Sequence, residues 1–348
     1  MVREISVDDF LLLNLPLVDV RSPGEFLKGH IPGAISIPLF TDAERAQVGT
    51  LYKQVSAEKA MEAGLRYVHP KLDDYILRSG KAAPDGYIAV HCWRGGMRSR
   101  AFAGHLSDNG FKEVYVITGG YKAFRNYVLS FFDTPFRLWI IGGYTGSGKT
   151  DILHYLGKSG LQTVNMEGLA HHKGSSFGAM GQEEQPTSEQ FENNLFEVIR
   201  KLDSNLPIWL EDESHNIGGV NLPMNLYTQM KNSPVFFLDM PKEKRALRLM
   251  EDYAHFEPEM IADAIRRISK RLGGQHTKSA LQFLEERNFY DLAMIVLTYY
   301  DKSYRKGLQF HNPDKVYSIS LNEPDPIKNA KVILKEYETI SGYKVDAV

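Results

Sequence analysis

The sequence predicts an α/β protein built from two domains, and three observations lead to this fold class. The chain has 348 residues, more than one hydrophobic core usually organises. Short apolar segments bounded by Gly, Pro or Asp alternate with amphipathic segments, as in open sheets covered by helices. Residues 132–135 (FDTP) interrupt this alternation, so we expect a boundary there and domains at residues 1–131 and 136–348.

The first domain is expected to be a small, open α/β domain. Its apolar runs predict four strands, at residues 17–20, 34–38, 87–91 and 113–117. A glycine pair then precedes a helical pattern at residues 119–131.

The second domain should contain a largely parallel sheet, because amphipathic segments separate its apolar runs and can serve as crossover helices. The expected strands are residues 137–141, 162–166, 207–210, 235–239 and 315–319. A helical insertion at about residues 258–304 interrupts this series.

Composition narrows the class of protein further. Hydrophobic residues make up 43% of the chain and charged residues 24%, which argues against disorder. No apolar run reaches the roughly 18 residues of a membrane helix, and residues 1–6 carry no secretion signal, so we expect a cytoplasmic location. Because the net charge is −2, any contact with nucleic acid requires a local basic patch.

The only cysteine, Cys92, follows an apolar strand and precedes a glycine loop and a helix. A single cysteine excludes an intramolecular disulfide and a multi-thiolate zinc site. A strand, loop and helix in this order aim backbone N–H groups at one point, which lowers the pKa of a thiol there, and Arg94 and Arg98 add positive charge. We therefore predict a nucleophilic thiol; the alternative is a buried cysteine in a tight turn.

A second motif accompanies this loop: residues 19–26 (DVRSPGEF), 29–34 (GHIPGA) and 37–38. On these residues the first domain resembles the rhodanese superfamily, whose loop cysteine carries a persulfide or a related chalcogen adduct. The resemblance implies that Cys92 is the nucleophile and that Asp19 and Arg21 are structural. The Cys-x5-Arg loop is one residue longer than the loop of sulfur-transferring rhodaneses. In this length it resembles the loop of those superfamily members that act on phosphate esters. A tetrahedral phosphorus anion, either selenophosphate or a phosphoester, suits this larger loop.

A glycine-rich segment in the second domain matches G-x-x-x-x-G-K-[ST] between an apolar strand and a helix, which predicts a P-loop NTPase-like domain. Its backbone N–H groups would surround a diphosphate, its lysine would reach the outer phosphate and its threonine hydroxyl would hold Mg²⁺. The segment comprises Gly143, Tyr144, Thr145, Gly146, Ser147, Gly148, Lys149 and Thr150. The bound diphosphate can belong to ATP, GTP or an isoprenyl diphosphate.

Other side chains are candidates for contacts around this loop. One of Glu211, Asp212 and Glu213, at the end of a predicted strand, should face the metal or act as a base. Further candidates for phosphate or RNA contacts are His172, Lys173 and Ser175 in a Gly-Ser loop and Arg245 and Arg248 after a strand. For each of them the alternative is an ordinary surface position.

A basic segment, residues 264–274, has a helical pattern that can place Arg267, Lys270 and Arg271 on one face. These charges would neutralise RNA phosphates without reading bases. The alternative is a solvated basic helix.

Residues 91–99, 142–150, 167–178 and 213–218 together resemble the tRNA 2-selenouridine synthase family. The resemblance implies two steps on the wobble 2-thiouridine of tRNA. Geranyl diphosphate alkylates the sulfur, and selenophosphate then delivers selenium with the loop cysteine. We expect geranyl diphosphate to bind at the P-loop. We expect no tightly bound cofactor, although Mg²⁺ can bind together with the diphosphate.

Three alternatives stay open at this point. The first is a phosphatase with Cys92 as nucleophile and Arg98 as clamp. The second is a P-loop kinase for a small molecule or nucleoside with a rhodanese-like module. The third is a nucleotide-dependent adaptor without catalysis, which leaves Cys92 without a role.

Overall fold

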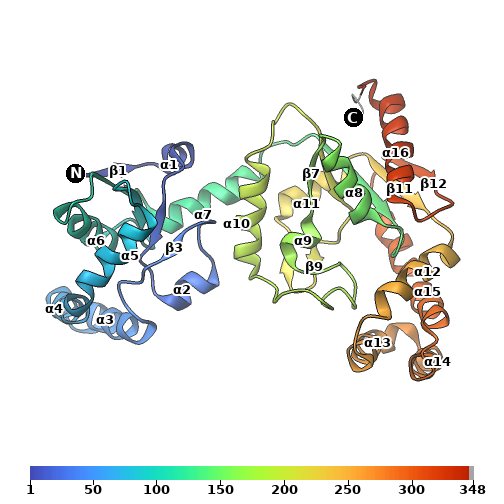
Figure 1. Cartoon of the computed structure of the whole chain (residues 1–348), viewed down its shortest axis with the longest axis horizontal. Coiled ribbons are helices and arrows are strands. Elements are labelled where there is room, and N and C mark those ends of the chain that lie inside the picture. The colour runs from blue at the N-terminus through green and yellow to red at the C-terminus, as the bar shows by residue number, and fades with distance from the viewer. Residues whose placement is uncertain (345–348) are drawn as a thin grey trace. The chain divides into compact units, whose positions relative to one another are not determined.

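The computed structural model describes residues 1–344 and divides the chain into two compact α/β units. The first unit comprises Met1–Phe131 together with Glu192–Asn194, and the second comprises Phe132–Phe191 and the chain from Leu195 (Figure 1). Both units contain a five-stranded parallel sheet, which confirms the predicted α/β class. No helix within residues 1–344 has the length and apolar character needed to cross a membrane.

The first unit has the strand order β1-β5-β4-β2-β3, and every adjacent pair is parallel. The four predicted strands are present, with slightly different ends: β2 Leu17–Asp19, β3 Ile35–Ser36, β4 Tyr87–His91 and β5 Glu113–Ile117. The edge strand β1, Val2–Ile5, was not predicted, because three of its four residues are exposed and no apolar run marks it. Its pairing with β5 holds it in the sheet.

Local sequence explains where the helices of this unit begin. Ser6 accepts a hydrogen bond from the backbone N–H of Asp9 at the start of α1, and Thr41 forms a capping box with Glu44 at the start of α3. Buried apolar side chains from β2, β4 and α6 form the core around the central strand. The helices are α1 Val7–Leu13, α2 Pro23–Lys28, α3 Asp42–Gln54, α4 Ala57–Val68, α5 Leu72–Ala82, α6 Met97–Asp108 and α7 Gly120–Phe131, with a 3-10 turn at His69–Lys71.

The second unit has the strand order β12-β11-β6-β8-β7, again with all neighbours parallel. All five predicted strands occur: β6 Leu138–Gly143, β7 Gln162–Val164, β8 Ile208–Glu211, β11 Val235–Asp239 and β12 Val316–Ser320. A short antiparallel pair, β9 Asn216–Ile217 and β10 Val220–Asn221, was not predicted. Because the strands are parallel, the loops after β6, β7 and β8 meet at one edge of the sheet, where ligands bind in such folds.

Helices cover this sheet and extend beyond it. Helices α8 Lys149–Lys158 and α16 Pro326–Ser341 pack together over one core. Helices α12 Lys242–Tyr253, α13 Pro258–Leu272, α14 Gly274–Glu285 and α15 Phe289–Leu308 share a second core (Figure 1). The last three occupy the place of the predicted insertion. The remaining helices are α9 Met166–Ala170, α10 Ser188–Ile199 and α11 Met224–Lys231, with a 3-10 turn at Pro313–Lys315.

Candidate functional site

The loop that carries Cys92 joins β4 to α6 and directs backbone N–H groups at the sulfur. Cys92 is only 3% exposed, and its Sγ lies 3.3 Å from Ser99 Oγ. Burial alone would raise the pKa of the thiol. Hydrogen bonds from Ser99 and from the backbone of Arg94 and Ser99, with the charge of Arg98, outweigh burial and hold the pKa below its usual value. These contacts favour the thiolate form of Cys92.

Glycines let this loop lie directly on the start of α7. Gly95 has φ +62°, and a Cβ there would lie 2.4 Å from the carbonyl oxygen of Ile117. Gly120 has φ +58°, and its Cβ would lie 2.3 Å from the carbonyl oxygen of Cys92. The backbone N–H of Tyr121 donates to that same oxygen at 2.9 Å. Only glycine fits either position, so the turn before α7 fixes the cysteine loop.

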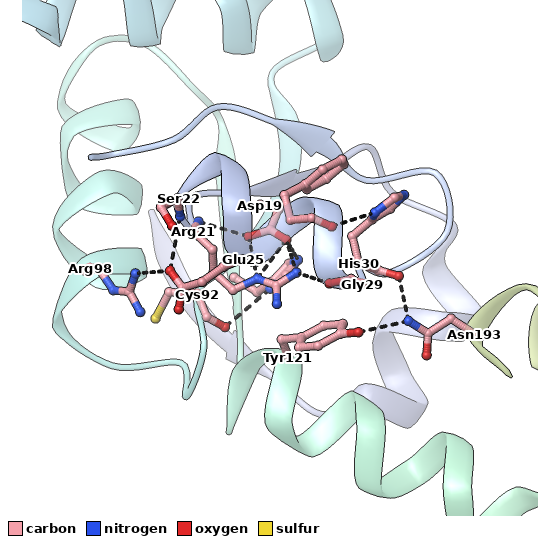
Figure 2. A network of polar contacts seen from close by, with 12 residues as sticks. Asp19, Arg21, Ser22, Glu25, Gly29, His30, Cys92, Arg98, Tyr121 and Asn193 are labelled. Carbon is pink, nitrogen blue, oxygen red and sulfur yellow. Dashed lines mark hydrogen bonds and ion pairs between the residues drawn. The ribbon is translucent and has the colours of Figure 1, made fainter. Parts of the chain in front are cut away.

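The two loop arginines have different surroundings. Arg94 is exposed to solvent. Arg98 is half-buried, and its Nη1 lies 3.1 Å from Glu25 Oε2, which also pairs with Arg45 at 2.8 Å (Figure 2). Glu25 belongs to the motif quoted for the rhodanese resemblance, but the sequence did not indicate that it meets the cysteine loop. An anion bound by Arg98 must share this guanidinium with Glu25.

A fully buried ion pair lies next to this loop (Figure 2). Arg21 Nη2 donates to Asp19 Oδ2 at 2.6 Å and to the carbonyl oxygen of Gly29 at 2.7 Å, and the guanidinium lies 3.8 Å from the ring centre of Tyr121. His91 Nε2 is 3.5 Å from Asp19 Oδ2. Burial alone would raise the pKa of Asp19, but His91 and Arg21 outweigh it and lower that pKa. The pair ties β2 to the loop after α2.

Removing the acidic partner of this pair should destabilise the protein strongly. Asp19→Ala leaves the Arg21 charge buried and uncompensated, which costs about 3–5 kcal/mol. Because the folded pKa of Asp19 is lowered, this stabilisation is present above the ordinary carboxyl pKa and disappears as the pH falls through the folded value. Urea denaturation followed by circular dichroism measures the loss. Glu62→Ala, which breaks the exposed pair with Lys59, is the control and should cost little stability, because solvent screens that pair; equal losses would contradict the prediction.

The P-loop lies between β6 and α8, where the sequence predicted it. Gly146 and Gly148 both have φ +82°, a conformation that favours glycine. Lys149 Nζ donates to the carbonyl oxygen of Gly143 at 3.1 Å and lies 4.9 Å from the ring centre of Tyr304. Thr150 Oγ1 donates to Glu167 Oε2 at 2.9 Å. The lysine and threonine side chains are therefore on the same side of the loop as an acidic group.

Arg245 and Arg248 hold the P-loop in different ways. Arg245 is buried and pairs with both carboxylate oxygens of Asp301, at 2.8 and 2.9 Å. It also donates to the carbonyl oxygens of Met240 and Thr145, so four of its five N–H groups have partners. Arg245 thus supports the loop; the sequence had offered it as a candidate for either a phosphate contact or an ordinary helix-surface charge. Arg248 pairs with Asp151 and comes within 3.0 Å of a Cβ built on Gly148.

The three consecutive acids after β8 differ in their surroundings. Burial and the charge of Glu167 raise the pKa of Glu211 to about 8 and raise that of Glu213 well above its usual value. Asp212 accepts from Lys231 Nζ at 2.6 Å and lies 3.0 Å from His311 Nε2, and these partners lower its pKa against the effect of burial. The sequence could not distinguish the roles of the three acids, because the partners of Asp212 lie far away in the chain, on α11 and after α15.

A cavity of about 930 Å³ in the second unit adjoins the P-loop. Its walls include Lys149, Thr150, Glu167 and Glu213. An aromatic part of the wall consists of Phe177, Tyr253, Phe256, Tyr299 and Tyr300. The sequence did not single out Glu167, Lys231, Tyr304 or these aromatic residues as site residues, although Glu167 and Phe177 lay in a segment that resembles the family.

The Gly-Ser loop folds over the acids and forms part of this cavity. A Cβ on Gly174, which has φ +65°, would lie 2.9 Å from Glu213 Oε2. His172 is buried, and burial lowers its pKa below the usual value of a histidine. His172, Lys173 and Ser175 all line the cavity. This placement is compatible with the predicted contacts and differs from a free surface loop.

Only some of the basic side chains of α13 line the cavity. Arg267 and Arg271 line it, and Arg267 donates to the carbonyl oxygen of Ser176 at 2.9 Å. Lys270 is exposed outside the lining. Arg266 pairs with Glu259 and Asp263, at 2.6 and 2.8 Å. Two of the three predicted basic residues therefore line the cavity, and all three lie on α13.

Mg²⁺, which the P-loop implies, fits the residues present. A protein often holds Mg²⁺ through one or two side chains, with substrate phosphates and water completing its shell. The Thr150 hydroxyl and the Glu167 carboxylate meet at 2.9 Å and can both serve as such ligands. Residues 1–344 contain no group of three or more His, Cys, Asp or Glu side chains that could hold a metal ion.

Two family models match the chain. Residues 136–323 match the tRNA 2-selenouridine synthase AAA domain, and residues 7–127 match the rhodanese-like domain. These matches confirm the predicted combination of a rhodanese-like domain and a P-loop-type domain.

Curated relatives extend the likeness over most of the chain. The tRNA 2-selenouridine synthase of Hydrogenovibrio crunogenus is 36% identical over 304 residues, which cover 80% of this chain and 82% of the relative. That of Bordetella petrii is 36% identical over 295 residues, covering 77% and 76%. That of Nitrosomonas europaea is 32% identical over 367 residues, covering 88% and 93%. The chain therefore belongs to the tRNA 2-selenouridine synthase family.

Proposed function

We propose that this protein is a tRNA 2-selenouridine synthase that geranylates wobble 2-thiouridine with geranyl diphosphate and then replaces the sulfur by selenium from selenophosphate. The names of the relatives support the overall activity. The observation that carries the geranyl step is the cavity, because it joins a diphosphate-binding loop to an aromatic wall. Such a wall suits an isoprenyl chain, which has no polar group to satisfy.

In the first step the C1–O bond of geranyl diphosphate breaks and a C1–S bond forms on the nucleobase. Diphosphate leaves with the electron pair, and the N3 proton of 2-thiouridine passes to solvent. The P-loop N–H groups and Lys149 bind the diphosphate, and Thr150 and Glu167 would hold Mg²⁺. When bound, Mg²⁺ would offset the negative charge of the leaving group.

In the second step the size of the Cys92 loop favours attack on phosphorus. The Cys92 thiolate bonds to the phosphorus of selenophosphate, the P–Se bond breaks, and hydrogen selenide leaves. Hydrogen selenide adds to C2 of the nucleobase, geranylthiolate leaves and takes a proton from water, and the hydrogen brought by selenium moves to N3. Water then cleaves the Cys92–phosphate bond and releases phosphate, which restores the thiol.

The two arginines that line the cavity should contribute to tRNA binding. Reversing both charges (Arg267→Glu with Arg271→Glu) should weaken binding at least about tenfold and reduce the slope of log affinity against log salt by about 2. Filter binding across a salt series measures both quantities. Arg266→Glu is the matched control, because Glu259 and Asp263 already neutralise that side chain. An equal loss in the control would show that only net charge matters and would contradict the assignment.

Mass spectrometry of tRNA nucleosides tests the proposed function directly. Incubation with geranyl diphosphate should add one geranyl group to 2-thiouridine, and later addition of selenophosphate should exchange sulfur for selenium. No mass change at either stage would overturn the proposal. Hydrolysis of an aryl phosphate that requires Cys92 would favour a phosphatase. ATP hydrolysis stimulated by a small substrate and not by tRNA would favour a kinase.

A further inference from the structure

One face of α12 extends from the P-loop along the cavity. Leu249 lies beside the phosphate-binding loop, since a Cβ on Gly146 would come within 3.4 Å of its Cγ. Tyr253 is one helical turn further, and Phe256 follows just after the helix ends. All three side chains line the cavity. Leu249 and Tyr253 are four positions apart and share a face of α12. Phe256 lies in the turn that follows, where its backbone N–H donates to the carbonyl oxygen of Tyr253 at 3.1 Å. The three side chains therefore mark an apolar path along the cavity wall that begins beside the P-loop.

The far part of this path is closed by aromatic side chains. Phe177 stacks on Tyr253 with ring centres 5.0 Å apart, and Tyr300 meets Phe177 edge-on at 6.4 Å. Phe256 packs against the same cluster. Its ring also lies against Gly181, where a Cβ would come within 3.1 Å of Phe256 Cε1. Phe256 is thus the bulky side chain at the end of the path.

The length of the path matches a short isoprenyl chain. Leu249 and Phe256 are seven positions apart: the four positions from Leu249 to Tyr253 rise about 6 Å along α12, and Phe256 lies in the turn beyond the helix end. A chain that starts at the P-loop and follows this face therefore meets the Phe256 ring after a short distance, which suits a chain of two isoprene units. A third unit would have to occupy the space of the Phe256 ring.

We infer that Phe256, supported by the Phe177–Tyr253 stack, limits chain length and selects geranyl diphosphate over longer isoprenyl diphosphates. This inference rests on the proposed function of the cavity. Discrimination by a hydrophobic pocket follows from its size, because a substrate that fills the space gains contacts and a longer one clashes. Phe256 is therefore a specificity-determining residue, and the P-loop supplies the shared diphosphate contacts.

Competition among dimethylallyl, geranyl and farnesyl diphosphates tests the inference, with the prenylated nucleosides of tRNA counted by mass spectrometry. Phe256→Ala should raise the ratio of farnesyl to geranyl product about ten- to hundredfold. Phe256→Trp should shift the products in the opposite direction, toward dimethylallyl. Leu247→Ala is the matched control, since Leu247 lies on the same helix, α12, is 44% exposed and is outside the cavity lining; it should leave the ratio unchanged.

The outcomes separate this inference from the proposed function. Unchanged product ratios in both Phe256 variants, with geranylation intact, would overturn the inference alone. Absence of prenylation by the unaltered protein with all three diphosphates would overturn the proposed function. Thermal melting checks that each variant is folded, and Phe256→Leu, which removes less volume, should give a smaller shift in the same direction if Phe256→Ala does not fold.

Discussion

Lys149→Ala should abolish geranyl transfer while the selenation of tRNA that already carries the geranyl group continues. The Lys149 ammonium is the only P-loop side chain with a full positive charge, and it meets the outer phosphate as negative charge develops on the leaving diphosphate. Removing such a group should slow the step by about 10²- to 10³-fold or more. Single-turnover formation of the S-geranyl nucleoside, followed by mass spectrometry, measures the effect.

The control for this variant is Lys158→Ala. Lys158 is an exposed lysine in the last turn of the same helix, α8, and lies outside the cavity lining. It should leave geranyl transfer unchanged. If Lys149→Ala stopped selenation of the pre-geranylated tRNA as strongly as it stopped geranylation, the assignment of the P-loop to the first step would be wrong.

The parts of the fold that could be predicted are those encoded by local patterns. Four of the five strands of the first unit and all five of the second sheet are apolar runs, and the P-loop is a contiguous motif between a strand and a helix. The edge strand β1 was missed because its exposed residues leave no such run, and only pairing with β5, more than 100 residues later, defines it.

The candidate site depends more on contacts between distant residues. Cys92 and Lys149 could be identified from their own loops. The partners of Asp212 are Lys231 and His311, which are 19 and 99 residues away, so the sequence could not distinguish it from Glu211 and Glu213. For Arg245 the sequence left a phosphate contact and a surface charge open, because its partner Asp301, which makes the guanidinium a support for the loop, is 56 residues away.

Cys92→Ser should stop selenation, by about 10³-fold or more, and leave geranyl transfer intact. A serine hydroxyl is scarcely ionised at neutral pH, whereas the Cys92 thiol has a lowered pKa and reacts as the thiolate. The measurement is the conversion of S-geranyl nucleoside to 2-selenouridine in one turnover. Loss of geranylation in Cys92→Ser would contradict the division of labour between the two loops.

The pH dependence of the second step provides an independent check on the thiolate. In the unaltered protein the selenation rate should rise as Cys92 ionises, at a pH below the usual range of a thiol, because Ser99 and the loop N–H groups stabilise the anion. Ser99→Ala removes one of these hydrogen bonds while retaining the sulfur, so the pKa of Cys92 should increase and the rising limb of the profile should move to higher pH. At high pH, where Cys92 is a thiolate in both the unaltered protein and Ser99→Ala, the two selenation rates should converge. A uniform loss of rate at every pH would instead mean that Ser99 holds the shape of the loop and that ionisation of Cys92 does not control the step.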